Sequence, residues 1–223
     1  MNKIKMLLTL FLIATCTSFA SYNALDLYLR NHGFPMTANG RDGNYTNEGY
    51  MTTEQQQQIR QQLRRYPITS IAEIGLNGGH SAFNFIQECN NLKKFVSFDL
   101  GIYPETQCAV QFFQKYYGQM FEFFGGPSQT SVPEYHKNNP TQTFDLIYID
   151  GSHEYEGCYL DIINCKKLAH QSTILWLDDF TFEGPTRAIK ELVDSEFIVI
   201  DDKFFSDGKC GGRAWMQFRY KNN

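Results

Sequence analysis

The sequence predicts a doubly wound α/β fold, with a sheet of about seven strands that is mostly parallel and has an antiparallel C-terminal strand. Two observations lead to this prediction. From Thr69 onward, short hydrophobic runs alternate with segments that have helical spacing. The chain also has 223 residues, of which 42% are hydrophobic, which is enough for one domain with a substantial core.

Seven hydrophobic runs are expected to form the strands: residues 71–75, 95–100, 121–124, 144–149, 174–177, 197–200 and 214–218. Helical spacing lies between them, for example at residues 109–117 and 155–168. Continuous hydrophobic strands separated by helices are typical of a parallel sheet covered on both faces. The glycine-rich residues 206–212 are too short for a helical crossover, so the last two strands should pair antiparallel as a hairpin.

Two helices are expected before the first strand. Residues 22–32 form a short amphipathic segment, and Thr52 or Thr53 can cap a helix that runs to about Leu63. Its glutamines, Gln55 to Gln58, are interpreted as a solvated face. Residues 33–50 are rich in Gly, Asn and Asp and predict a loop. We therefore expect an N-terminal helical and loop segment (21–66) that covers the site of the main domain (67–223).

The first twenty residues resemble a secretory signal peptide. Lys3 and Lys5 precede a hydrophobic stretch at residues 6–14, and Ser18-Phe19-Ala20 has the small-x-small pattern of a cleavage site. The hydrophobic stretch is about half of the roughly 20 residues that a spanning helix needs. We expect export to the periplasm, the exterior or a host, with no stable membrane span after cleavage. An uncleaved signal would instead anchor the chain in the membrane.

Composition argues against two classes of protein. The net charge is −4 and no cluster of Lys and Arg occurs, whereas a nucleic-acid-binding protein usually has a basic face. Five cysteines follow the signal without a CxxC pair, which argues against a zinc site. Cys158 and Cys165 would lie about 10.5 Å apart along one helix, beyond the roughly 7 Å limit for a disulfide. Ordinary buried thiols are expected.

The first strand leads into a loop whose glycines allow a tight turn and close approach to a ligand. The loop contains Glu73, Gly75, Asn77, Gly79 and Ser81. Asn77 stands where a dinucleotide-binding fingerprint would have its second glycine, so this loop lacks that fingerprint. On its own, the loop is equally well explained as a turn without a ligand.

Four aspartates stand at the ends of successive predicted strands: Asp99, Asp150, Asp178 and Asp179. In an open α/β sheet, ligands bind beyond the carboxyl ends of the strands, where an acid after the second strand can accept both hydroxyls of a ribose. The other three acids should converge, and a cation such as Mg²⁺ would relieve their repulsion. A single such aspartate is often only a helix cap, but four in sequence favour a functional site.

With these motifs, the chain resembles the class I S-adenosylmethionine-dependent methyltransferases, in the catechol O-methyltransferase-like branch, over about residues 49–218. The residues that carry the resemblance are Gly49-Tyr50-Met51-Thr52, the loop from Glu73 to Ser81, Gly126-Pro127-Ser128-Gln129, and Asp150 with Asp178-Asp179. The stretch from Ile149 to Gly157 is also similar to cephalosporin hydroxylase-like and macrocin-type sugar O-methyltransferases. The resemblance implies a Rossmann-like fold and S-adenosylmethionine as cofactor.

The resemblance also implies roles for individual residues. Those expected around the methionine part of the cofactor are Met51, Glu73, Gly75, Gly79 and Ser81, with Asn77 in the same loop. Asp99 would hold the ribose, and Ser128 with Gln129 would face the adenine. Asp150, Asp178 and Asp179 would bind a divalent metal. His153 stands where the catechol enzymes have a catalytic lysine and would act as the base; its alternative role is a structural helix cap.

The function that follows is metal-assisted O-methylation of a small acceptor that carries hydroxyl groups, with Asp150 and His153 as the catalytic residues. Two alternatives remain open. Export would separate the chain from a cofactor made in the cytosol, which favours a non-catalytic binding protein with this fold. A hydroxylase-like or sugar-modifying enzyme is the other alternative, because the segment Asp150 to His153 occurs there as well. A homodimer is a further expectation about partners.

Overall fold

The computed structural model describes residues 24–34, 53–205 and 214–221. The chain forms two compact units, residues 1–47 and 48–223. In the first unit, α2 (Ala24–Asn31) confirms the helix expected at residues 22–32. The predicted signal peptide, Met51 and the loop at residues 206–212 lie outside the described residues.

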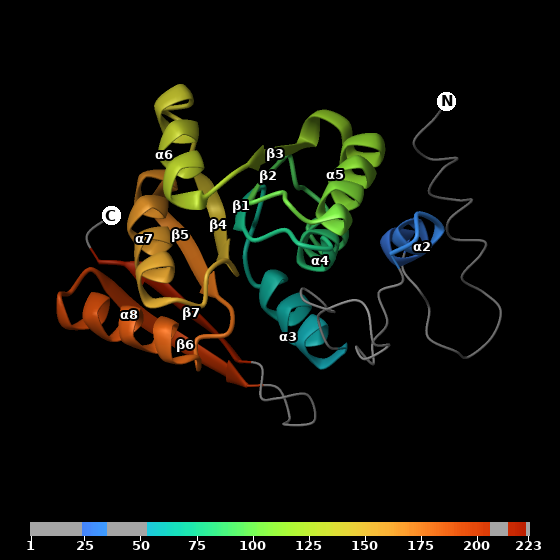
Figure 1. The fold of residues 1–223 in the computed structure, drawn as a ribbon. Helices are drawn as coiled ribbons and strands as arrows, with labels where there is room; N and C mark the ends of the chain where they lie inside the picture. The colour runs from blue at the N-terminus through green and yellow to red at the C-terminus, as the bar shows by residue number, and fades with distance from the viewer. Residues whose placement is uncertain (1–23, 35–52, 206–213, 222–223) are drawn as a thin grey trace. The chain divides into compact units, whose positions relative to one another are not determined.

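The second unit is built on a seven-stranded sheet with the order β3-β2-β1-β4-β5-β7-β6 (Figure 1). The strands are β1 (Ser70–Ile74), β2 (Lys94–Asp99), β3 (Phe121–Gly125), β4 (Phe144–Ile149), β5 (Ala169–Leu177), β6 (Ile198–Phe205) and β7 (Ala214–Tyr220). The first five pair in parallel. This arrangement confirms the predicted doubly wound α/β fold.

The reversed strand is β7, which pairs antiparallel with both β5 and β6. β7 therefore lies between its neighbours rather than at the sheet edge, and β6 forms the edge. The β6–β7 pair confirms the predicted hairpin, although β6 continues five residues past the predicted end at Ile200 to Phe205. The extension consists of exposed or half-buried residues at the edge of the sheet, so no hydrophobic run marked it in the sequence.

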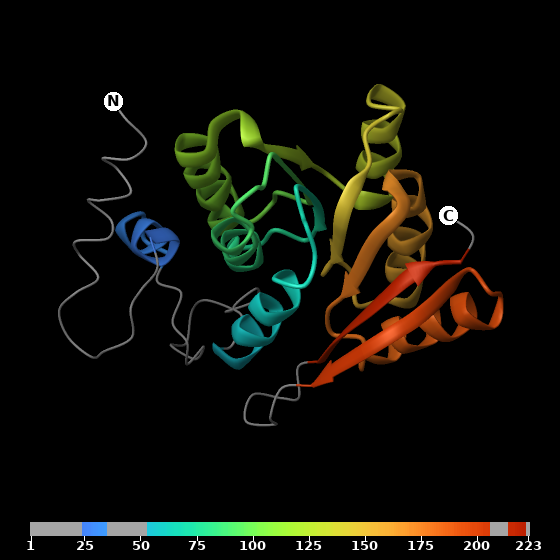
Figure 2. The ribbon, with the colours of Figure 1, turned by 180° about the vertical axis from the view of Figure 1, so that it is seen from behind.

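Helices cover both faces of the sheet (Figures 1 and 2). They are α3 (Thr53–Leu63), α4 (His80–Glu88), α5 (Pro104–Tyr117), α6 (Ser128–Asn138), α7 (Tyr155–Cys165) and α8 (Glu183–Asp194). Short 3-10 turns follow α5 and α7, at Gly118–Met120 and Lys166–Leu168. Side chains of α6, α7 and α8 share one buried hydrophobic cluster with one face of the sheet.

The opposite face is packed with aromatic side chains. The Phe85 ring of α4 lies 5.0 Å from the ring of Tyr148 and 6.1 Å from that of Trp176. Trp176 also contacts Trp215 of β7 at 4.9 Å. Because side chains alternate along a strand, Ile147 and Ile149 point to the other cluster while Tyr148 points here. The same alternation determines the direction of the Asp178 side chain, which follows directly after β5.

The α3 helix corrects one expectation from the sequence. Of the four glutamines, only Gln57 is exposed, while Gln55 retains 1% of its surface. The amide of Gln58 donates a hydrogen bond to the carbonyl of Phe205. The glutamine run is therefore not a solvated face: the buried Gln55 has a partner, Asp178, directly after β5, which the sequence pattern cannot reveal.

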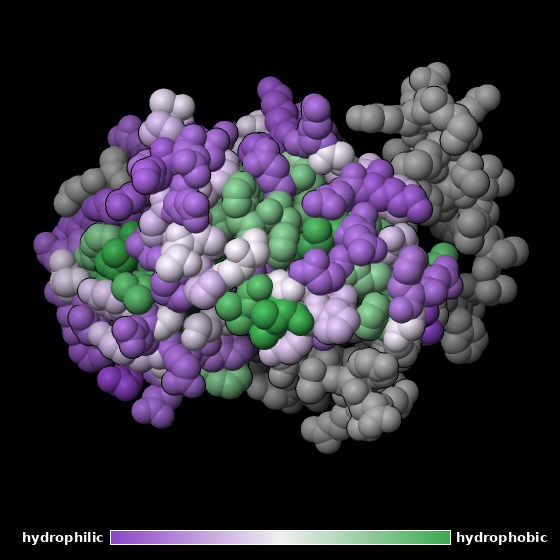
Figure 3. Space-filling model, turned by 45° about the horizontal axis from the view of Figure 1, so that its top comes forward, coloured by the Kyte–Doolittle hydropathy of each residue, from purple (hydrophilic) through white to green (hydrophobic). Residues whose placement is uncertain are grey.

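Two smaller expectations can be checked in the described residues. Cys89, Cys108, Cys158 and Cys165 are buried and form no disulfide, as expected. Within the described ranges, no helix is long and hydrophobic enough to cross a membrane. The face of the molecule drawn in Figure 3 is largely hydrophilic, with hydrophobic residues gathered in small patches.

Candidate active site

The strand order places β1 between β2 and β4. From β1 the chain adds β2 and β3 on one side and then β4 and β5 on the other, so the strand order reverses at β1. Backbone hydrogen bonds continue just past the strand ends, from Gly75 N to Phe98 O at 2.7 Å and from Asp150 N to Ile74 O at 2.8 Å. The residues that follow β1, β2 and β4 are therefore held side by side. Ligands bind at such a switch point in open α/β sheets.

The loop between β1 and α4 depends on residues in the left-handed region. Gly75 has φ +94°, and a Cβ at this position would overlap the carbonyl oxygen of Asp150. Asn77 and Gly79 also have positive φ, at 45° and 80°. Only glycine fits at Gly75, because the backbone after β4 passes directly against it. This packing fixes the loop relative to Asp150.

Glu73, on β1, supports this loop from the interior of the protein. Its side chain has no exposed surface, and its two oxygens accept hydrogen bonds from Ser81 at 2.5 Å and Ser97 at 2.9 Å. Burial raises the pKa of Glu73 to about 8, against the effect of the two serine hydroxyls. Glu73 and Ser81 thus lie in the interior, where they brace the loop rather than face open space.

Asp99 ends β2 and faces the same loop. Its Oδ2 accepts hydrogen bonds from the backbone N–H groups of Leu76 and Asn77, at 2.9 and 3.0 Å, and Oδ1 accepts one from Gly101 at 2.7 Å. An ionised carboxylate has about four lone-pair positions. The backbone uses three, so Asp99 ties the two loops together and retains room for about one further donor.

Ser128 and Gln129 begin α6, directly after the predicted Gly126-Pro127 turn. Both are half-buried, and both donate to one oxygen of Asp161 on α7: Ser128 Oγ at 2.6 Å and Gln129 Nε2 at 3.4 Å from Oδ1. Asp161 is 1% exposed, and burial raises its pKa to about 6. Sequence reasoning missed Asp161; the only signal was an acid between Leu160 and Ile162 inside a hydrophobic helix.

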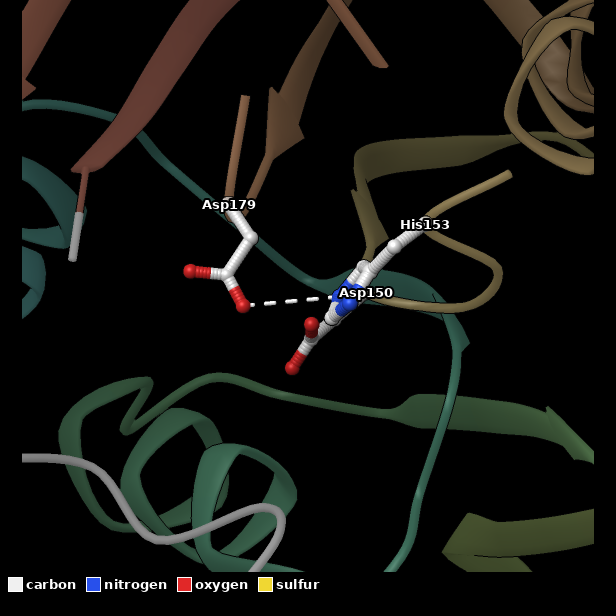
Figure 4. A group of neighbouring side chains, drawn as sticks. All are labelled: Asp150, His153 and Asp179. Carbon is white, nitrogen blue, oxygen red and sulfur yellow. Dashed lines mark ion pairs between the residues drawn. The ribbon is translucent and has the colours of Figure 1, made fainter. Parts of the chain in front are cut away.

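Three side chains converge after β4 and β5: Asp150, His153 and Asp179 (Figure 4). One potential ligand atom of each lies within 4.8 Å of those of the others. His153 Nε2 is 3.4 Å from Asp179 Oδ2, the pair joined by the dashed line in Figure 4. The His153 ring also stacks on Phe182, with centroids 4.8 Å apart and planes inclined by 9°. Phe182 holds the imidazole in place, a role that sequence reasoning did not identify.

Asp178 corrects the expectation that three aspartates converge. Within the described residues, the cluster contains His153 and not Asp178. Asp178 is 4% exposed and accepts hydrogen bonds from Tyr148 at 2.7 Å and from Gln55 at 3.0 Å. The physical reason is alternation: Asp178 continues β5 with its side chain on the Tyr148 face, and Asp179, with φ 50°, turns away from it.

The start of α8 holds the His153 loop in position. A Cβ on Gly184 would overlap the carbonyl oxygen of His153 and would lie 2.7 Å from the backbone nitrogen of Tyr155. The two loops that carry His153 and Asp179 therefore pack backbone to backbone. This contact limits the freedom of both side chains relative to Asp150.

A family model of a methyltransferase domain matches residues 72–180, from the middle of β1 to just past Asp179. Residues 72–180 are a methyltransferase domain. The match contains every site residue predicted from the sequence except Met51. No curated protein matches the chain in sequence.

Solved structures share the fold of the methyltransferase domain and its flanking elements. An O-methyltransferase from Bacillus cereus in complex with S-adenosylhomocysteine (SAH) has a TM-score of 0.68 at 15% identity, with 94% of each chain covered. TomG of Streptomyces achromogenes is an O-methyltransferase of tomaymycin synthesis, solved in complex with S-adenosylmethionine (SAM). It has a TM-score of 0.67 at 12% identity, with 99% of each chain covered. At such identities the likeness concerns the fold, which is the Rossmann-like fold of class I methyltransferases.

Proposed function

We propose that this protein is an S-adenosylmethionine-dependent methyltransferase that methylates a hydroxyl group of a small acceptor with the help of a divalent cation. The observation that carries the proposal is the convergence of Asp150, His153 and Asp179 at the strand ends of a methyltransferase domain. Acceptor chemistry and metal dependence are the parts that require experiment.

Cofactor binding is supported by the shape of the loop after β1. Its left-handed residues bring the backbone close to the ends of β2 and β4, and Asp99 accepts hydrogen bonds from its backbone. Ser128 and Gln129 follow the end of β3, the strand beside β2. The similar proteins from B. cereus and S. achromogenes were solved with SAH and SAM. S-Adenosylmethionine supplies a methyl group on a cationic sulfur when it is bound.

The donor set supports a divalent cation. Asp150 and Asp179 provide carboxylate oxygens, the ligands that Mg²⁺ and Mn²⁺ prefer, and they come from neighbouring strand ends. A cation held there would lower the pKa of a bound hydroxyl group. Both residues are only partly exposed, so the charge of the site is not fully screened by solvent.

His153 is proposed as the proton acceptor. Its Nε2 faces Asp179 at 3.4 Å, so an Nε2–H would donate there and leave Nδ1 to accept the hydroxyl proton. Asp179 then stabilises the imidazolium, and the stacked Phe182 ring keeps the imidazole in place. Most of the rate advantage would come from alignment of donor and acceptor, which is worth up to roughly 7–11 kcal/mol.

Turnover with a panel of catechols and sugars tests the proposal. Asp150→Ala should abolish methyl transfer and leave SAH binding within a few-fold of the wild-type value, while Asp194→Ala, an exposed change on α8, should alter neither. Equal loss of turnover and SAH binding in Asp150→Ala would mean that Asp150 acts in folding. A chain that binds SAH and methylates no acceptor would favour the binding-protein alternative.

We also propose export through residues 1–20, which N-terminal sequencing of the mature protein tests.

A further inference from the structure

The buried carboxylate of Asp161 does not contribute to the stability of the fold in an obvious way. Its Oδ1 accepts two hydrogen bonds, but Oδ2 is buried and has no hydrogen-bond partner among the described residues. A buried carboxylate with one unsatisfied oxygen destabilises a fold relative to a hydrophobic residue of similar volume. Gly151 also leaves room for it, since a Cβ there would lie 3.0 Å from Oδ2. These features indicate that Asp161 serves the two residues that it contacts.

The contacts determine which hydrogen-bonding groups the α6 N-terminus presents. An ionised carboxylate only accepts, so Ser128 must direct its hydroxyl hydrogen, and Gln129 its amide N–H, toward Asp161. The hydroxyl lone pairs of Ser128 and the carbonyl oxygen of Gln129 then remain for a ligand. Both residues are half-buried and keep some exposed surface. The pair therefore presents acceptors, and acceptors recognise an amino group.

We propose that Asp161 is a positioning residue that makes the Ser128–Gln129 pair select a cofactor base with an exocyclic amino group over one with a carbonyl oxygen. This inference rests on the proposed function, because it requires the adenine of the cofactor to lie against Ser128 and Gln129. Adenine carries an amino group at the position where hypoxanthine carries a carbonyl oxygen. Two acceptors facing that oxygen would be left unsatisfied and would repel it.

The test compares two ligands: SAH and its deaminated analogue S-inosylhomocysteine. Calorimetric titration of the full chain at pH 8, where Asp161 is ionised, should show SAH binding tighter by roughly 5- to 150-fold, the range that one unsatisfied buried polar group produces. In Asp161→Asn, an amide of the same size either donates or accepts, so Ser128 and Gln129 are free to reverse. The affinity ratio should fall to within about threefold, mainly through tighter binding of the inosyl ligand.

A second variant keeps the test independent of how Asp161→Asn folds. Gln129→Asn retains the amide but withdraws it from Asp161 by one methylene group, and it should also lower the ratio. A merely structural role of Asp161 would weaken both ligands equally and leave the ratio unchanged, which would overturn the inference. Equal binding of the two ligands by the wild-type chain would overturn it as well. If the wild-type chain binds neither ligand, the proposed function fails and takes this inference with it.

Discussion

Glu73 has no exposed surface, and its carboxyl group is held by Ser81 and Ser97. Its pKa is raised from 4.5 to about 8, so the folded state binds the proton more tightly than the unfolded state. The resulting stabilisation is fully present below about pH 4.5 and is lost as the pH rises through about 8. Loss over this window amounts to up to roughly 5 kcal/mol.

Glu73→Gln should therefore flatten the dependence of unfolding free energy on pH between 5 and 9 and make the variant more stable than the wild-type chain at pH 9. Urea denaturation at a series of pH values measures this. Glu134→Gln, a change at an exposed residue of α6, is the matched control and should follow the wild-type curve. Parallel curves for Glu73→Gln and the wild-type chain would show that Glu73 is already ionised at low pH.

Asp178 and Asp179 are adjacent in sequence but lie in different surroundings, which predicts different effects on metal binding. Electron paramagnetic resonance of added Mn²⁺ measures binding without any need for an acceptor. Asp150→Asn and Asp179→Asn should each weaken Mn²⁺ binding by about tenfold or more, because each removes one anionic ligand. Asp178→Asn should change it by less than about threefold, since this carboxylate is engaged by Gln55 and Tyr148. Equal losses of Mn²⁺ affinity in Asp178→Asn and Asp179→Asn would mean that both aspartates bind the metal, as expected from the sequence alone.

At the scale of elements, the contact between the start of α8 and the His153 loop is a point of close packing. Gly184→Ala forces a methyl group into the backbone at His153 and should lower the free energy of unfolding by about 1–3 kcal/mol. Gly125→Ala is the control, because its Cβ would meet only ordinary contact at 3.5 Å. Its cost should stay within about 0.5 kcal/mol in the same denaturation experiment. If both variants are equally stable, the two loops are not held together as described.

The elements differ in how well the sequence predicts them. β4 has the predicted bounds because Phe144–Ile149 is a hydrophobic run, interrupted only by Asp145, between the polar residues Thr143 and Asp150. β5 begins five residues earlier than predicted, since His170 to Ser172 are polar and partly exposed at its start. The positions of Asp99 and Asp150 at strand ends were predictable for the same reason as the strands. The direction of Asp178, the burial of Gln55 and the role of Asp161 depend on neighbours far apart in sequence, and hydrophobic patterns carry no such information.

At the scale of the whole molecule, the arrangement of hydrophobic strands and helices preserves the fold at low sequence identity. The structures from B. cereus and S. achromogenes share only 15% and 12% of residues with this chain, yet their TM-scores are 0.68 and 0.67. The methyl transfer that we propose would rest on fewer positions, those at the ends of β1, β2, β4 and β5. The acceptor cannot be predicted from these positions, because in the proposed function they would contact the cofactor and the reacting hydroxyl group rather than the rest of the substrate.

The central claim is that this fold binds S-adenosylmethionine at the switch point of the sheet. Calorimetric titration of the full chain with S-adenosylmethionine, with and without Mg²⁺, tests it most directly. Our account predicts saturable micromolar binding at one site per chain in both conditions, because the loop after β1 and Asp99 form the cofactor site without the metal. Absence of binding heat in both conditions, with the chain folded, would contradict the account.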